Sequence, residues 1–171
     1  MTAIGPALVL LQKFERRHLA QTLQWTNDPE LARLLGRAGR VTGDEHERWF
    51  SGLEERSDTL FFAIETEGGR HVGNVWLADI DRRHDKAEVR IVIGDRDAMG
   101  LGVGSRAIDL MACHAFAALR LHRLYAFVLA FNFRARRAFE KSGFQLEGVL
   151  RQDRRSDDAY TDVFVLGRIA S

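Results

Sequence analysis

Cysteine is almost absent from this sequence of 171 residues, in which Cys113 is the only one. A single cysteine excludes an intramolecular disulfide and the paired-cysteine spacing of zinc sites, and it suits a reducing compartment. We expect Cys113 to be a small core residue of a helix rather than a nucleophile. None of the six histidines forms a pair with metal-ligand spacing, so the sequence predicts no metal.

Long hydrophobic runs and an excess of one charge are missing too. No segment approaches the ~20 apolar residues that a membrane span needs, and the charged run 15–17 is unlike a signal peptide. Lys and Arg total 25 against 24 Asp and Glu, so no overall field favours nucleic acid or an acidic membrane. We expect a single cytoplasmic domain over residues 1–171, without nucleic-acid or membrane partners.

Strand and helix signals alternate along the whole chain. Asp28 before a proline and the Thr42-x-x-Glu45 capping box predict the starts of two early helices, the second carrying His46 on its surface. β-Branched and alternating segments predict strands at 7–12, 59–65, 71–80, 89–93, 124–130, 145–150 and 160–169.

The stretch 87–107 carries the most specific signal. It opens with a β-branched run and continues into Gly100, Gly102 and Gly104, and glycine permits positive φ or the close approach of a ligand. We expect Ser105 to cap the helix that follows. Free amides at a helix N-terminus bind anions with the help of the helix dipole. This stretch therefore predicts a site for a phosphate-bearing cofactor.

Three kinds of phosphate-binding loop have glycines of this kind. A P-loop ends in Lys followed by Ser or Thr, whereas here Ser105 follows Gly104 directly. The dinucleotide fingerprint matches in letters over 102–107, but it should follow a strand tightly and precede an acidic ribose ligand by about 20 residues, and neither condition holds. A loop for the diphosphate of coenzyme A remains, with a plain strand-to-helix turn as its structural alternative.

Two motifs in this order resemble the GCN5-related N-acetyltransferase (GNAT) family. Residues 99–107, Met-Gly-Leu-Gly-Val-Gly-Ser-Arg-Ala, resemble its acetyl-CoA loop, and residues 132–144 resemble its Asn-x-x-Ala-x-x-x-Tyr-x-x-x-Gly-Phe segment. The resemblance covers 8–169 and looks closest to the branch of ribosomal-protein N-terminal acetyltransferases. It implies an α/β fold whose mixed, twisted sheet of about seven strands is flanked by helices, with a splayed central strand pair that binds acetyl-CoA.

The resemblance also implies which residues bind acetyl-CoA. They are the edge of one splayed strand, the glycine loop and parts of the second motif: Ile91, Val92, Ile93, Met99, Gly100, Leu101, Gly102, Val103, Gly104, Ser105, Asn132, Arg134, Arg137 and Phe139. Phe139 stands where the family commonly has a tyrosine that protonates the CoA thiolate, and a phenyl ring has no proton to give. Tyr125, Ser142 or water could supply that proton, or the thiolate leaves unassisted.

Two other positions keep alternatives open. Leu101 replaces a basic residue found in relatives, so the phosphates are left to arginines on nearby segments, namely Arg96, Arg106, Arg134, Arg136 and Arg137. A solvent-facing basic helix explains the last three equally well. Asn132 could contact the cofactor, cap its own helix, or do both.

Acetyl transfer to an amine requires a neutral amine, and a nearby carboxylate can take its proton. Glu88 is our choice for this base, because it begins the strand that leads to the glycine loop and relatives often have a glutamate in a similar context; a solvated strand face is the alternative. By resemblance alone, Trp25, Asn27 and Arg37 wall the acceptor site, although Trp25 fits a core role equally well.

The sequence leaves the acceptor open between a protein N-terminus and a small amine such as an amino sugar. It shows no clustered acidic pocket that would help a polyamine to bind. Exposed final strands favour a homodimer. Because of Phe139, a non-catalytic acyl-CoA-binding module of the same fold is the alternative to an N-acetyltransferase.

Overall fold

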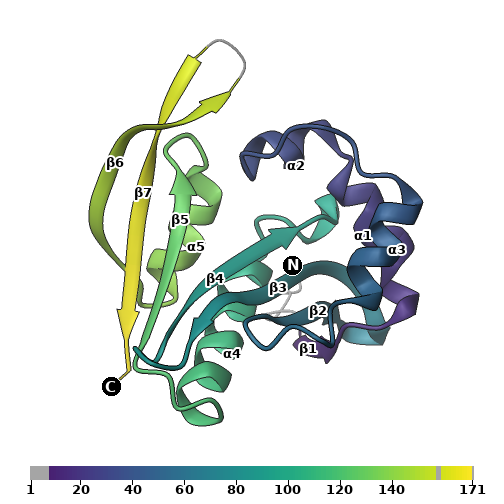
Figure 1. The fold of residues 1–171 in the computed structure, drawn as a ribbon, viewed down its shortest axis with the longest axis horizontal. Coiled ribbons are helices and arrows are strands. Elements are labelled where there is room, and N and C mark those ends of the chain that lie inside the picture. The colour runs from purple at the N-terminus through teal and green to yellow at the C-terminus, as the bar shows by residue number, and fades with distance from the viewer. Residues whose placement is uncertain (1–7, 157–158, 171) are drawn as a thin grey trace, which may run out of the picture.

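The computed structural model describes residues 8–156 and 159–170, which form one mixed sheet with helices on both faces (Figure 1). The strands are β1 (Val9–Lys13), β2 (Leu60–Thr66), β3 (Arg70–Asp81), β4 (Lys86–Ile93), β5 (Arg123–Leu129), β6 (Gln145–Ser156) and β7 (Ala159–Ile169). The α-helices are α1 (Leu19–Thr26), α2 (Pro29–Leu34), α3 (Gly43–Ser51), α4 (Val103–Ala117) and α5 (Phe133–Lys141), and short 3-10 turns cover 16–18, 67–69 and 96–98.

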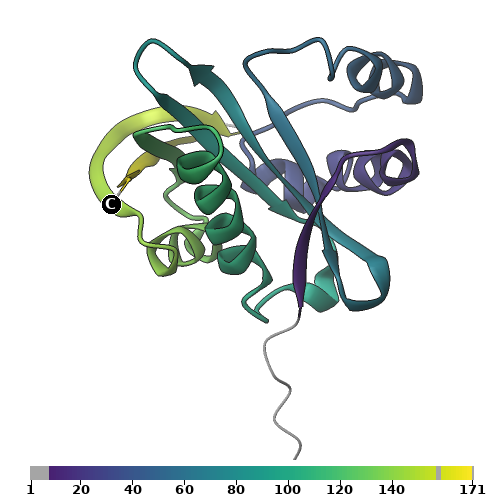
Figure 2. The same ribbon diagram turned by 90° about the horizontal axis from the view of Figure 1, so that it is seen from below.

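The strand order is β1-β2-β3-β4-β5-β7-β6, and only the central pair β4–β5 is parallel. Helices α4 and α5 cover one face of the sheet, while α1, α2 and α3 lie on the other (Figure 2). All seven expected strands are present, and the predicted α/β fold is confirmed.

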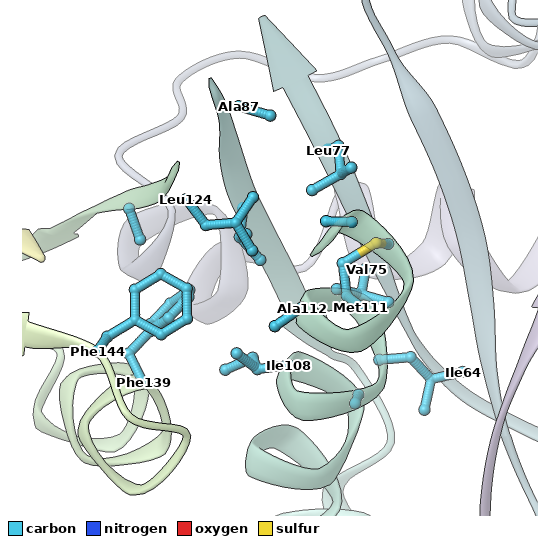
Figure 3. Close-up of a cluster of buried hydrophobic side chains, with 14 of the residues drawn as sticks. Ile64, Val75, Leu77, Ala87, Ile108, Met111, Ala112, Leu124, Phe139 and Phe144 are labelled. Atoms are coloured by element: carbon cyan, nitrogen blue, oxygen red, sulfur yellow. The ribbon is translucent and has the colours of Figure 1, made fainter. Parts of the chain in front are cut away.

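The main core lies between α4 and the sheet. Ile108 and Met111 on α4 are fully buried against Ile64, Leu77 and Leu124 of the strands (Figure 3). Alanines on the same helical stripe let the helix approach the sheet closely, because they add little volume. This packing fixes where α4 begins, at the end of the glycine loop.

A smaller core lies on the opposite face and holds the early helices. Phe14 packs edge-on against Phe61 of β2, with ring centroids 4.9 Å apart, and against Trp49 and Phe50 of α3. The capping box of Thr42 forms as predicted. These contacts hold α1 and α3 above the sheet and leave room between them.

Strands β4 and β5 pair over only three residues at their beginnings. The last registered pair is Glu88 with Tyr125, although β4 continues to Ile93 and β5 to Leu129. Beyond that pair the two strands diverge (Figure 1). The expected splay is confirmed, and the edge of β4 that faces β5 is free of strand pairing from Val89 onward.

Three sequence-based expectations about single residues are wrong. Gly102, not Ser105, caps α4, because the positive φ of this glycine ends the loop and its carbonyl accepts the N–H of Arg106. Cys113 is exposed, since it lies off the buried stripe of α4. His46 is buried rather than on the surface, stacked on Trp49.

Candidate active site

The glycine loop forms an open cradle at the N-terminus of α4. Gly100 and Gly102 have φ of +78° and +82°, and a Cβ on either would meet nothing within 4 Å. The first hydrogen bond of the helix runs from the N–H of Arg106 to the carbonyl of Gly102. The backbone N–H groups before Arg106 therefore have no acceptor within the helix. Those of Val103 and Gly104 therefore lie where the helix dipole favours an anion.

Other predicted cofactor residues surround this cradle. Ile91 and Ile93 pack against the main core, whereas Val92 faces the opposite side of the sheet. The guanidinium of Arg134 on α5 lies 3.5 Å from the sulfur of Met99, so α5 reaches the loop. Leu101 is exposed at the loop.

The arginines near the cradle fall into two groups. Arg96 is held by Glu30 at 2.8 Å and by Asp28 at 3.3 Å. Arg136 is bound to Glu140 on its own helix at 2.8 Å and lies over the ring of Phe164. Arg106, Arg134 and Arg137 form no ion pair with the described part of the chain and are the ones available for phosphates.

Asn132 and Phe139 both have structural roles. Asn132 accepts the N–H of Ala135 at 3.2 Å as the cap of α5 and donates to the carbonyl of Leu34 at 3.1 Å, which ties α5 to α2. Phe139 is buried edge-on against Phe144 (Figure 3). Ser142 donates to backbone carbonyls of Ser105 and Ala138, at 2.8 and 2.9 Å, so its proton is already committed.

Glu88 lies at the point where the strands separate. Its side chain is buried, and its carboxylate accepts from Arg90 at 2.6 Å. Arg90 covers it and also lies 3.6 Å from Asp79. Beside it on β5, Tyr125 has a raised pKa, chiefly because burial disfavours the phenolate and then because Glu88 and Asp79 are negatively charged.

A cavity of about 490 Å³ opens on the face of the sheet that carries α1 and α3. Its lining includes Trp25 of α1, Trp49 of α3 and Trp76 of β3, and the floor includes Arg90 and Val92 of β4. The cavity therefore meets the splayed strand on the side away from α4. A neighbouring groove, lined in part by Asp79 and Tyr125, adjoins it.

Gly94 determines how Trp25 sits. A Cβ on Gly94 would lie 2.0 Å from the indole ring, so only glycine lets the ring pack over the end of β4. Helix α1 is fixed by polar contacts as well: Asn74 donates to Thr22 at 3.1 Å. The backbone N–H of Glu15 bonds to Nδ1 of His18, which leaves Nε2–H of that ring to donate to the buried Glu65 at 2.9 Å.

The predicted acceptor residues are only partly brought together. Trp25 and Arg37 line the cavity, but Asn27 does not; its amide instead bonds both backbone groups of Val41, at 2.8 and 2.9 Å. Two residues of the cavity lining, His46 and Asp79, are not predicted from the sequence. No periodicity singles these residues out, because they come from separate elements.

A glycine loop at a helix N-terminus, an open strand edge and a separate aromatic cavity together fit one class of protein, a transferase with a phosphate-bearing cofactor and a separate acceptor. No helix in the described ranges is long and apolar enough to cross a membrane. Within 8–156 and 159–170, no three His, Cys, Asp or Glu side chains are grouped to hold a metal ion.

Comparison with known proteins agrees with this class. A family model described as an acetyltransferase (GNAT) domain matches residues 9–145. The N-acetyltransferase 9-like protein of Caenorhabditis briggsae is 27% identical over 146 residues, which cover 80% of this chain and 74% of that protein. The probable N-acetyltransferase YjcK of Bacillus subtilis is 31% identical over 114 residues, covering 67% of this chain and 63% of that protein.

The fold is shared with solved enzymes. A crystal structure of spermidine N-acetyltransferase from Vibrio cholerae in complex with CoA and spermine has a TM-score of 0.89 at 24% identity, covering 94% of this chain and 95% of that chain. Because the family model matches residues 9–145, the chain belongs to the GNAT acetyltransferase family, whose cosubstrate is acetyl-CoA. The class predicted from the two motifs, an acetyl-CoA-dependent N-acetyltransferase, is confirmed.

Proposed function

We propose that this chain transfers an acetyl group from acetyl-CoA, held between β4 and β5, to a primary amine bound in the aromatic cavity, by direct attack in a ternary complex. One observation carries the proposal: strand pairing stops at Glu88 and Tyr125, residues of the unpaired part of β4 line the cavity, and the glycine loop follows the end of the same strand. The two substrates would thus meet at one point from opposite faces.

The cofactor contacts that we propose follow this geometry. The amides at the start of α4 bind the diphosphate, the free edge at Ile91, Val92 and Ile93 bonds the pantetheine amides, and Arg134 and Arg137 reach the remaining phosphate. Bound acetyl-CoA supplies an activated thioester carbonyl carbon. Gly100 and Gly102 have a positive φ that favours glycine, and they place no side chain in the open space where we propose that the diphosphate binds.

Glu88 is the proposed proton acceptor for the amine. Its carboxylate does not line the cavity, whereas Arg90, which covers it, does, so we propose that an intervening water relays the proton. The neutral nitrogen then attacks the carbonyl carbon and gives up its second proton to solvent, and the carbon–sulfur bond breaks as the tetrahedral intermediate collapses, so that the sulfur leaves as a thiolate that takes up a proton.

Tyr125 is the proposed proton donor to the departing thiolate. Its phenol is protonated at neutral pH even with an ordinary pKa, which burial raises further, and it lies at the last paired position before the strands part. Phe139 is a core residue and Ser142 is bonded to backbone carbonyls, so neither supplies the proton. Tyr125 on β5 would thus protonate the thiolate in place of the tyrosine that the family commonly has at the position of Phe139.

A small amine is the acceptor that the cavity volume suits. The structural neighbour named for spermidine and the expected branch of ribosomal-protein N-terminal acetyltransferases mark the two acceptor classes to test. A cytoplasmic location and a single domain over 1–171 stay predictions. So does a homodimer, which exposed apolar residues of β6, Leu146 and Val149, would support.

The test is amine-dependent release of CoA thiol from acetyl-CoA, with pooled amino sugars, polyamines, small amino acids and N-terminal peptides, and mass spectrometry of the acetylated product. Stoichiometric release and acetylamine formation in one pool would establish the activity. Acetyl-CoA binding without release in any pool would favour the non-catalytic module instead.

A further inference from the structure

The charges that line the aromatic cavity are unevenly neutralised. Its lining includes Arg37, Arg56 and Arg90 but only two carboxylates, Asp58 and Asp79. Arg90 is already held by the buried Glu88 and lies near Asp79. Arg37 and Arg56 are both exposed, and over the described ranges neither has a carboxylate within ion-pair distance. The cavity therefore contains guanidinium groups whose charge this chain does not balance.

A buried nitrogen without a partner lies in the same wall. His46 is 6% exposed, its ring stacks on Trp49 with centroids 5.0 Å apart, and its Nε2 has no hydrogen-bond partner among the described residues. A buried polar atom left unpaired costs free energy. His46 belongs to the lining of the cavity, and its buried Nε2 lies behind the cavity wall.

We infer that the acceptor carries an anionic group, a carboxylate or a phosphate, in addition to its primary amine, and that Arg37 and Arg56 bind that group. The inference rests on the proposed function. Guanidinium groups match both anions with two parallel hydrogen bonds. Asp58 and Asp79 also line the adjoining groove beside Tyr125, so the amine binds on that side, near Glu88.

A polyamine does not fit this charge pattern. Spermidine carries only positive charges, and binding it here would bring its ammonium groups toward two guanidinium groups that no carboxylate neutralises, so the like charges would repel. This chain would therefore differ in its acceptor from the spermidine enzyme whose fold it shares.

Tryptophan fluorescence gives a direct test. The sequence has three tryptophans, Trp25, Trp49 and Trp76, and all of them line the cavity, so the emission reports on this site without turnover. The protein with CoA is titrated with two matched pairs, phosphoethanolamine against ethanolamine and β-alanine against propylamine, and with spermidine. We expect an anionic member to bind at least about tenfold more tightly than its partner and than spermidine.

Single variants assign the anion site. Arg37→Gln, Arg56→Gln or both should reduce the advantage of the anionic member to about threefold or less, because the paired cation is lost. Arg40→Gln, an exposed arginine on the same loop that does not line the cavity, should keep it. The two pairs show separately whether carboxylate or phosphate is preferred.

The inference is overturned if both members of each pair bind equally, if spermidine binds more tightly, if neither arginine variant changes the advantage, or if no anionic amine changes the emission. Binding and turnover separate the two proposals. Acetylation of a purely cationic amine would leave the proposed function standing and remove this inference. Tight binding of an anionic amine without CoA release would do the reverse.

Discussion

At the scale of single residues, the geometry of the site depends on a few positions at which another side chain could not take the same place. Gly94 makes room for the ring of Trp25, and the pair of Glu88 with Tyr125 marks where the sheet opens. Glu88 was predicted from its place on the strand, but its cover by Arg90 was not, because that contact depends on the twist and pairing of β4.

Replacing Gly94 with alanine tests the placement of Trp25. The new Cβ would overlap the indole ring, so Gly94→Ala should destabilise the fold by about 1–3 kcal/mol and raise KM for the amine more than KM for acetyl-CoA. Urea unfolding and steady-state kinetics measure both effects. Gly43→Ala, where a Cβ meets nothing within 4 Å on a helix, should leave the free energy of unfolding unchanged or higher; an equal loss in both variants would refute the packing argument.

At the scale of elements, the glycine loop and α5 could be recognised from sequence because their chemistry is local. The glycine spacing predicts the loop correctly. It does not predict the cap of α4, because the left-handed Gly102 ends the loop three residues before Ser105. The cavity could not be predicted: its walls come from α1, α3 and three strands, and His46 is buried only because α3 packs on the smaller core.

A matched pair of glycines isolates the role of the loop. Gly102 and Gly68 have φ of +82° and +80°, and a Cβ on either meets nothing within 4 Å. Alanine should therefore cost each about 1–2 kcal/mol of stability, but only Gly102→Ala should weaken CoA binding, by about tenfold, because its Cβ would face the diphosphate. Calorimetric titration with CoA measures the difference. Equal CoA affinity in the two variants would argue against the cradle.

At the scale of the whole molecule, the sheet has a gap between β4 and β5, and one hydrophobic core packs on each face of the sheet. The main core holds α4 to β1–β5, and the smaller one holds α1 and α3. Buried neutral histidines in and beside the second core link the stability of the molecule to pH.

Stability should decline on mild acidification. Burial lowers the pKa of His46 and His71 below the ordinary 6.5, so the unfolded chain binds protons first as pH falls. The free energy of unfolding should therefore be fully retained above about pH 6.5 and fall below it. Urea unfolding at about pH 7.5 and about pH 5.5 should show a smaller loss for His46→Phe than for wild type. His122→Gln, at an exposed histidine, should lose as much as wild type; a loss in His46→Phe equal to wild type would contradict the assignment.

The central claim is that an amine loses its proton to Glu88 and attacks acetyl-CoA where β4 and β5 part. Its most direct measurement is kcat for acetylamine formation across pH in wild type, Glu88→Gln and Tyr125→Phe. Asp85→Asn serves as a control, because this exposed turn residue has a φ of 48° that asparagine tolerates.

We expect Glu88→Gln and Tyr125→Phe each to lower kcat by roughly 10²-fold with acetyl-CoA affinity retained. Activity of Glu88→Gln should recover at high pH, where the free amine is already neutral, while Asp85→Asn stays at the wild-type rate. Full activity of Glu88→Gln at neutral pH, or an equal loss in Asp85→Asn, would contradict the central claim.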